Sequence, residues 1–422
     1  MKALREKIER EIQSRGPIPF SRYMEMCLYD EEFGYYSRDA AQFGKAGDFY
    51  TSSDVHAVFG RLLARQFDEM WRTLGSPDRI LLRELGPGRG LFARDLLDWS
   101  AKKFPEFFHA LAYVLDERSQ ALRQRLEQSL DIHLNSGKAK LGWQGAQQCC
   151  DTRQSNETEV AKRSHSLARH VSGGQASRQD RVPSGTTQAD DAASSGPQAS
   201  TLVFANEFFD AIPVEVVSSS GSLRIDARNG RFVETWVPPS PEELEFLDRY
   251  SVHPEPGERV EVSLQSQLRM KAAAEIERGF IVAIDYGYTR EEQLAGRHRG
   301  TVKAIRQHAV SDNPYEAPGD QDITADVNFT ALAAETEKHG FHAQKLITQS
   351  QFLLGIGEAN EFADAFEDCR LPQERAKVAL QLKHLVTPAG MGESFHVLAA
   401  SKGVKEEDVS SLAGLSFGRS SA

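Results

Sequence analysis

The sequence lacks three features that would each indicate a class of protein. It has no excess of positive charge, because 50 Lys and Arg oppose 61 Asp and Glu for a formal net charge of -11, and nucleic-acid and anionic-membrane surfaces need concentrated positive charge. Its four cysteines form neither a Cys-x-x-Cys pair nor a metal-ligand spacing. No apolar run approaches the ~20 residues that span a bilayer. We therefore expect no nucleic-acid partner, no metal site and no integral membrane segment.

Two further absences concern location and order. Residues 1–16 are charged throughout and lack the apolar core of a secretory signal, and the cysteine usage indicates a reducing compartment. Residues from about 144 to 199 are rich in Ser, Gln, Asp, Arg, Thr and Gly and have no hydrophobic period. Because such a segment cannot bury enough apolar surface to offset its chain entropy, we predict a disordered insert there. The insert would interrupt a domain over residues 79–403, between an N-terminal helical segment with a lid loop (1–78) and a flexible tail (404–422).

The most informative stretch of the chain is residues 80–90, Ile-Leu-Leu-Arg-Glu-Leu-Gly-Pro-Gly-Arg-Gly. The apolar run is typical of a buried parallel strand, and residues 91–99 have the apolar spacing of a helix. A strand, a glycine-rich turn and a helix open a nucleotide-binding α/β unit. A dinucleotide fingerprint reads Gly-x-Gly-x-x-Gly, whereas Gly86, Gly88 and Gly90 follow a Gly-x-Gly-x-Gly pattern. The glycines therefore favour a different ligand, or else an ordinary turn.

Two acids indicate which ligand. Glu84 stands just before the first glycine, where a carboxylate would repel a pyrophosphate but accept hydrogen bonds from an ammonium group. Asp116 ends the next apolar run, residues 111–115, and is well placed to accept hydrogen bonds from two ribose hydroxyls. A ligand with a ribose, an amine and no phosphate is S-adenosylmethionine. The predicted cofactor-binding residues are Glu84, Gly86, Gly88, Gly90 and Asp116.

The rest of the chain alternates strand and helix patterns. We predict helices over residues 2–15, 21–28, 55–74, 119–130, 261–277 and 327–338 and within 358–385. We predict strands over residues 201–205, 279–288, 345–349 and 395–400, and an antiparallel addition over 214–217, 223–227 and 231–237 with Asn229-Gly230 as a hairpin turn. We predict a loop over residues 300–328 and a polar, frayed tail beyond Lys402. The alternation predicts an α/β doubly wound sheet.

Polar residues end four of the predicted strands: Glu84, Asp116, Asn206 and Asp285. Because the carboxyl ends of parallel strands meet at one edge of a doubly wound sheet, a single crevice would collect these side chains. Any one of them alone could be a helix cap or a solvated turn residue. The four together favour a binding site.

Several motifs resemble those of a known family. The glycine motif at residues 84–90, together with Asn-Glu-Phe-Phe-Asp-Ala at residues 206–211, closely resembles the family of the mitochondrial complex I assembly arginine methyltransferase and its bacterial relatives. Further matches lie at residues 33–36, 47–52, 285–287 and 321–327. The resemblance implies a class I S-adenosylmethionine-dependent methyltransferase with a Rossmann-like sheet, N-terminal helices, a β-hairpin insertion and a helical insertion. The chain departs from the family at Ser53-Asp54, where Pro-Glu is common, and at Asn328, where Asp is usual.

For the mitochondrial member, the resemblance implies a protein arginine methyltransferase that acts on a respiratory complex I subunit. It implies a cytoplasmic location in a bacterium, or the mitochondrial matrix in a eukaryote. Because an arginine acceptor is protonated at neutral pH, it needs carboxylates that orient the guanidinium and take up its proton. We assign that role to Glu207 and Asp210, with Asn206 fixing the loop or the acceptor; the alternative is a helix-capping cluster. A small-molecule methyltransferase and a cofactor-binding assembly chaperone with little catalysis remain open as alternative functions.

Overall fold

The structure is a computed structural model that describes residues 2–37, 57–142, 200–306 and 309–417. These residues all belong to one compact unit, formed by residues 1–142 and 199–422. The predicted insert at 144–199 and the motif at 47–52 lie outside the described residues. Within the described part of the chain, no helix is long and apolar enough to cross a membrane.

The main sheet, as far as the described residues show it, has nine strands. In spatial order they are β15 (His342–Ala343), β17 (Phe395–Lys402), β10 (Arg278–Tyr288), β5 (Ser200–Asn206), β2 (Ile80–Leu85), β3 (Leu111–Asp116) and β4 (Ala139–Gly142), with β14 (Val327–Asn328) on β10 and β16 (Ile347–Thr348) on β17. β4, β3, β2, β5 and β10 run parallel, and β17 is antiparallel to β10. The strand order reverses between β2 and β5, which is where a doubly wound sheet opens its binding crevice.

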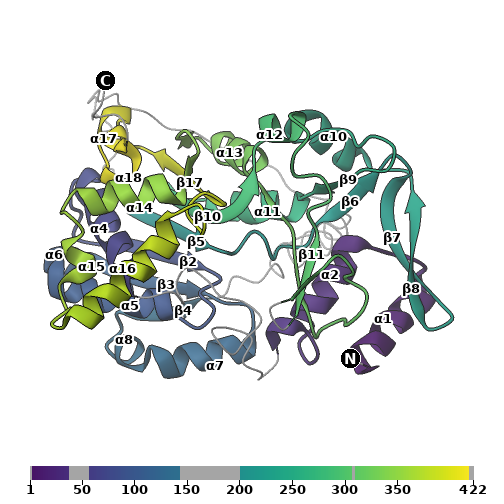
Figure 1. Cartoon of the computed structure of the whole chain (residues 1–422), viewed down its shortest axis with the longest axis horizontal. Helices are drawn as coiled ribbons and strands as arrows, with labels where there is room; N and C mark the ends of the chain where they lie inside the picture. Colours follow the sequence, from purple (N-terminus) through teal and green to yellow (C-terminus); the bar gives the residue numbers. More distant parts are fainter. Residues whose placement is uncertain (1, 38–56, 143–199, 307–308, 418–422) are drawn as a thin grey trace, which may run out of the picture. The chain divides into compact units, whose positions relative to one another are not determined.

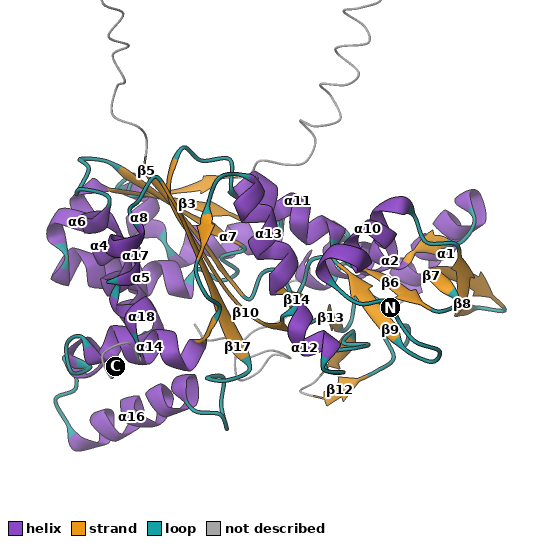
Figure 2. Cartoon of the chain, turned by 90° about the horizontal axis from the view of Figure 1, so that it is seen from above, coloured by secondary structure: helices purple, strands orange, loops and turns teal. Residues whose placement is uncertain are grey.

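Helices cover both faces of this sheet, and the strands are apolar on both sides for that reason. In β5, Leu202 and Phe204 enter a core with α4 (Val58–Thr73) and α5 (Leu91–Lys103). Val203 and Ala205 enter a second core with α11 (Leu264–Ala273) and α13 (Phe329–Lys338). Figure 2 shows α11 and α13 on the opposite side of the sheet from α4 and α5. The predicted α/β doubly wound sheet is therefore confirmed. The helices of this part of the chain are α4 (Val58–Thr73), α5 (Leu91–Lys103), α6 (Pro105–Ala110), α7 (Gln120–Ser129), α8 (Asp131–Asn135), α11 (Leu264–Ala273), α13 (Phe329–Lys338), α14 (Gln349–Glu358), α15 (Ala363–Phe366), α16 (Pro372–Val386), α17 (Glu406–Ser410) and α18 (Ala413–Ser416).

A second, antiparallel sheet lies beside the N-terminal helices (Figure 1). It is formed by β1 (Ile18–Pro19), β7 (Gly221–Arg228), β6 (Glu215–Ser218), β9 (Arg259–Val262) and β8 (Arg231–Val237). The remaining helices of the described residues are α1 (Lys2–Arg15), α2 (Phe20–Tyr29), η1 (Tyr35–Ser37), α10 (Pro241–Tyr250) and α12 (Arg290–Leu294). The hairpin turn predicted at Asn229-Gly230 is confirmed, because Arg228 pairs with Arg231 and both turn residues have positive φ. α1 and α2 bury Leu4, Ile8 and Leu28 in a core with this sheet.

Two segments predicted from the sequence differ in type from the structure. The helix expected over residues 261–277 begins only at Leu264, because the period-two pair Val260 and Val262 is buried in strand β9. The loop expected over 300–328 contains a small antiparallel sheet, β12 (Ala309–Ser311), β11 (Lys303–Arg306) and β13 (Asp322–Thr324). Strands this short carry too few residues to show a period in sequence.

In the C-terminal part of the chain, the bounds of one strand and the structure of the tail also differ from the predictions. The strand expected over 345–349 shrinks to β16, because Thr348 accepts a hydrogen bond from the Gln351 backbone and starts α14. The tail prediction is wrong for residues 404–417, where Val409, Leu412 and Leu415 are buried in the main core. These side chains reach a hydrophobic surface that the rest of the fold supplies, so a mostly polar segment still packs.

Candidate functional site

The glycine loop joins β2 to α5 at the point where the strand order reverses. Gly86, Gly88 and Gly90 have φ of 64°, 55° and 73°, a left-handed region that favours glycine. A Cβ on Gly86 would lie 2.7 Å from the Phe208 ring, whereas a Cβ on Gly88 would meet nothing within 4 Å. The loop is therefore packed against the 206–211 segment on one side and open at Gly88.

Glu84 is a buried carboxylate at the end of β2, where the sequence places it. It is 4% exposed, and its Oε2 accepts a hydrogen bond of 2.8 Å from the Tyr113 hydroxyl. Burial raises the pKa of Glu84 to about 8, against the opposing effect of Tyr113. No ion pair to Glu84 is found among the described residues. A buried acid without a cation is suited to a ligand that brings a positive charge.

Asp116, the predicted ribose ligand, and its neighbour Glu117 lie in different environments. Asp116 forms an ion pair with Arg83 of the neighbouring strand. Glu117 is 7% exposed, and burial raises its pKa to about 7 although backbone N–H groups of Ser119, Gly88 and Arg118 oppose the shift. Glu117 therefore lies against the glycine loop. Sequence reasoning missed Glu117, although it keeps the phase of the buried Tyr113 and Leu115, and successive strand residues point to opposite faces.

The 206–211 segment begins at the last residue of β5 and is held by Asp285, in the second half of β10. The buried Asp285 Oδ2 accepts hydrogen bonds from the backbone N–H groups of Phe208 at 3.1 Å, Phe209 at 2.9 Å and Asp210 at 3.3 Å. Burial raises the pKa of Asp285, and the neighbouring Asp210 and Glu207 carboxylates raise it further, against these backbone donors. Glu207 has φ of 49°, which is uncommon for a residue with a side chain and marks a conformation held by its surroundings.

The two acids of this segment lie in different environments. Asp210 is 4% exposed and accepts hydrogen bonds from the Tyr286 hydroxyl at 2.6 Å and the Thr324 hydroxyl at 3.1 Å; burial raises its pKa against these two bonds. Glu207 is only half-buried, and its Oε1 accepts a hydrogen bond of 3.1 Å from Asn206 Nδ2. No helix begins between β5 and β6, so the helix-capping alternative is wrong. Asp210 joins this segment to β10 and β13, and Glu207 is the more accessible acid.

Asn206 also has an unsatisfied atom beside Glu207. Its Oδ1 is buried and has no hydrogen-bond partner within the described part of the chain. Buried polar atoms are normally paired, so an orphan at a strand tip indicates a place for a ligand donor.

Aromatic residues from the N-terminal segment connect the two sides of the site. The Tyr36 hydroxyl donates to Asp322 Oδ1 of β13 at 3.1 Å, and the Tyr36 carbonyl accepts from the Ser119 hydroxyl at 2.6 Å. Ser119 caps α7 two residues after Glu117. The predicted motif at 33–36 therefore lies at the site, while the remainder of the predicted lid loop lies outside the described residues.

Comparison with known proteins identifies the family. Residues 62–347, which include the glycine loop, the 206–211 segment and β13, match the family described as S-adenosyl-L-methionine-dependent methyltransferases. The chain belongs to this family. The methyltransferase is 30% identical to "Protein arginine methyltransferase NDUFAF7 homolog, mitochondrial" of Drosophila melanogaster, over 95% of this chain and 85% of that one. It is 26% identical to "Protein arginine methyltransferase NDUFAF7, mitochondrial" of Homo sapiens, over 92% and 81%.

A solved structure agrees in fold. A protein from Burkholderia thailandensis, crystallised with S-adenosyl-homocysteine, superposes on this methyltransferase with a TM-score of 0.74 at 26% identity, covering 99% of this chain and 95% of that one. The residues of the site fit the cofactor. Glu84 is buried without a paired cation among the described residues, Glu117 is buried against the glycine loop, and the loop is open at Gly88.

Proposed function

We propose that this methyltransferase acts on an arginine side chain of a protein substrate. The observation that carries the proposal is the pair at the tip of β5: a half-buried Glu207 beside Asn206, whose buried Oδ1 has no hydrogen-bond partner among the described residues. A guanidinium presents five N–H donors in a planar fork, which suits a carboxylate and an amide oxygen side by side. The names of the relatives support the same acceptor.

In methyl transfer, the main task of the protein is to position the acceptor and the cofactor. When bound, the cofactor supplies a methyl group already activated by its sulfonium, so no nucleophilic side chain or metal is needed. Glu207 would orient the acceptor guanidinium and take up its proton as the methyl arrives. Asp285 would hold Glu207 in place through the backbone of residues 208–210, and Asp210 would hold the same segment through Tyr286.

The cofactor-binding roles are part of the proposal. Glu84 would accept hydrogen bonds from the amine of S-adenosylmethionine, and the glycine loop would let the backbone approach the ligand. We assign the ribose hydroxyls to Glu117 instead of Asp116, because Arg83 pairs with Asp116 and Glu117 lies against Gly88. Each assignment places a hydrogen-bond donor of the ligand beside a buried carboxylate.

The substrate and the compartment follow from the resemblance and the relatives. We propose a subunit of respiratory complex I as the substrate, in the mitochondrial matrix of a eukaryote or in the cytoplasm of a bacterium. The support is the 30% identity to a mitochondrial protein arginine methyltransferase over nearly the whole chain.

The test follows transfer of a labelled methyl group into cell extract. We expect label in the protein fraction, and methylarginine after hydrolysis of that fraction. Glu207→Gln keeps the oxygen that accepts from Asn206 and removes the charge, so it should lower transfer by ~100-fold or more with cofactor affinity unchanged. Glu245→Gln, at an exposed glutamate of α10, is the matched control and should behave as wild type.

Other outcomes would contradict the proposal in distinct ways. Label confined to small molecules would indicate a small-molecule methyltransferase. Tight cofactor binding without any transfer would indicate an assembly chaperone. Wild-type transfer by Glu207→Gln, or loss of cofactor affinity in step with transfer, would remove Glu207 from the acceptor site.

A further inference from the structure

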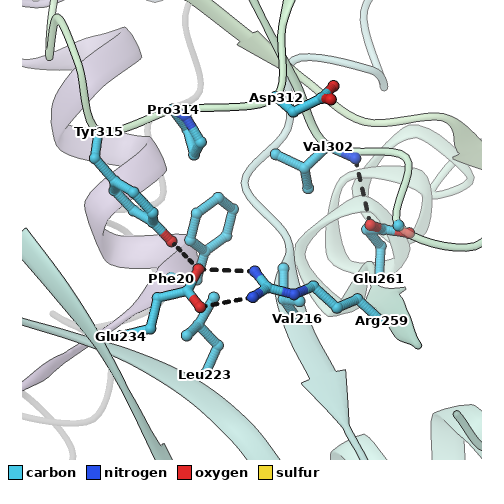
Figure 3. Close-up of a pocket in the computed structure, with 11 residues that line it drawn as sticks. Phe20, Val216, Leu223, Glu234, Arg259, Glu261, Val302, Asp312, Pro314 and Tyr315 are labelled. Carbon is cyan, nitrogen blue, oxygen red and sulfur yellow. Dashed lines mark hydrogen bonds and ion pairs between the residues drawn. The ribbon is translucent and has the colours of Figure 1, made fainter. Parts of the chain in front are cut away.

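Several arginine side chains of the structure form close ion pairs with carboxylates. Arg65 pairs with Asp364 at 2.6 Å. Arg259, on the wall of the cavity shown in Figure 3, donates from its two terminal nitrogens to Glu234 Oε1 and Oε2 at 2.7 and 2.6 Å. Arg269 of α11 differs, because this half-buried side chain forms no hydrogen bond and no ion pair with any described residue.

Arg269 belongs to a cluster in which guanidiniums outnumber carboxylates. The carboxylate that acts on Arg269 is Glu25. Its Oε2 accepts a hydrogen bond from Arg22 at 2.9 Å, and its Oε1 accepts from Arg118 at 3.3 Å, so both oxygens are already in use. Glu11 is also taken, because it accepts two hydrogen bonds from Arg22, at 2.9 and 3.0 Å. Three guanidiniums therefore share two carboxylates, and an anion would complete the cluster.

Arg118 borders the proposed acceptor site. It directly follows Glu117, and its guanidinium lies 5.2 Å from the centroid of the Tyr29 ring. The Tyr29 hydroxyl donates to the Ala211 carbonyl of the 206–211 segment at 3.0 Å. One tyrosine therefore separates Arg118 from the segment that carries the proposed acceptor residues.

Arg269 lies beside the same segment. The next residue of α11, Met270, is buried in one hydrophobic core with Phe209. Burial lowers the pKa of Arg269, and the nearby Arg118 lowers it further, so the two guanidiniums are close enough to repel each other. A positive charge without its own carboxylate is thus held at the edge of the acceptor site.

This charge matters for an arginine acceptor, which is itself a cation at neutral pH. Arg118 and Arg269 would repel the acceptor unless the substrate brings a carboxylate that neutralises them. The carboxylate of S-adenosylmethionine does not fit that role. It shares one carbon with the amine that we assign to Glu84, whereas Arg118 follows Glu117, which we assign to the ribose.

We propose that Arg269 and Arg118 bind an acidic side chain, aspartate or glutamate, that lies near the methylated arginine in the protein substrate. The proposal rests on the function proposed above and names a feature of its substrate. A carboxylate has two oxygens and can accept from both guanidiniums at once. The pair would select, among protein arginines, those that have an acid close by.

The experiment measures peptide binding to the full chain with the cofactor site filled by S-adenosylhomocysteine. The probes are acetylated, amidated peptides of glycine and serine with one central arginine and one glutamate at a varied distance from it. The matched probes carry glutamine in place of glutamate. NMR signals of the arginine side chains report binding at Arg118 and Arg269. For at least one placement, we expect both signals to shift and the dissociation constant to be about tenfold lower than with glutamine.

Variants assign the preference to the two arginines. Arg269→Gln should reduce the preference for glutamate over glutamine to about threefold or less, whereas Arg269→Lys should keep part of it, because lysine retains the charge but not the planar fork. A merely structural role would weaken both peptides equally. Arg249→Gln, at an exposed arginine of α10, is the matched control and should keep the full preference. If Arg269→Gln does not fold, Arg118→Gln decides, since the Arg118 side chain is 39% exposed.

Three results would overturn the inference. They are the absence of any glutamate peptide that binds more tightly than its glutamine match, a preference that survives both Arg269→Gln and Arg118→Gln, and a loss of S-adenosylhomocysteine affinity in Arg269→Gln, which would make the pair a cofactor site. Methylation of a protein arginine without a glutamate preference would overturn the inference and leave the proposed function standing. A glutamate preference in a protein that methylates only small molecules would overturn the proposed function together with the occupant named here.

Discussion

The pKa of Glu84 makes cofactor binding depend on pH in a direction that can be worked out. Burial raises this pKa to about 8, so the free protein holds Glu84 protonated at pH 6 and 7. A cationic amine favours the ionised carboxylate. Binding should therefore release a proton, and the affinity should rise with pH.

The size of the effect follows from the ionised fraction. With a pKa of about 8, that fraction rises from about 1% at pH 6 to about 25% at pH 7.5, which corresponds to an affinity gain of about 25-fold, or about 1.9 kcal/mol. Glu117, with a pKa of about 7, should steepen the rise below pH 7 if its charged form accepts the ribose hydroxyls. Glu84→Gln has no proton to release and should lose most of the dependence.

The assay is calorimetry with S-adenosylhomocysteine, which keeps the amine and the ribose but transfers no methyl group. Titrations at pH 6.0, 6.5, 7.0 and 7.5, each in two buffers of different protonation enthalpy, would give the affinity and the number of protons released. An affinity that stays flat or falls with pH would refute the reasoning. The same slope in Glu84→Gln would show that another group is responsible.

Three further predictions concern individual parts of the structure. Glu117→Gln should weaken cofactor binding by ~1.5 to 3 kcal/mol in calorimetry. Asp116→Asn should weaken the same binding by less than ~1 kcal/mol, because the partner of Asp116 is Arg83. A larger loss of affinity in Asp116→Asn than in Glu117→Gln would restore Asp116 as the ribose ligand. Asp285→Asn should lower the free energy of unfolding in urea by ~2 kcal/mol and the rate of methyl transfer by at least ~10-fold, because an amide nitrogen would face backbone N–H donors. An unchanged rate of methyl transfer would show that Asp285 has no positioning role. Deleting residues 404–422 should lower the free energy of unfolding by at least ~3 kcal/mol, since each buried apolar side chain contributes ~1.5 to 3 kcal/mol. An unchanged melting temperature would show that this segment contributes little to stability.

The sequence by itself determined the parts of this protein that depend on local pattern. The apolar run before Gly86 is typical of a buried strand, and the alternating glycines predicted a tight turn; the structure has both, with positive φ at the three glycines. The Asn229-Gly230 hairpin follows from the same kind of rule, because few residues tolerate that turn. Such features need no knowledge of distant neighbours.

Tertiary structure decided what depends on neighbours from elsewhere in the chain. Asp116 and Glu117 differ in environment because Arg83 of the adjacent strand pairs with Asp116 and the glycine loop covers Glu117. Glu207 and Asp210 look equivalent in sequence, but Tyr286 and residues of β13 bury only Asp210. Burial and pairing are properties of the assembled fold, since they depend on which distant groups exclude water or supply a donor. No local pattern contains that information.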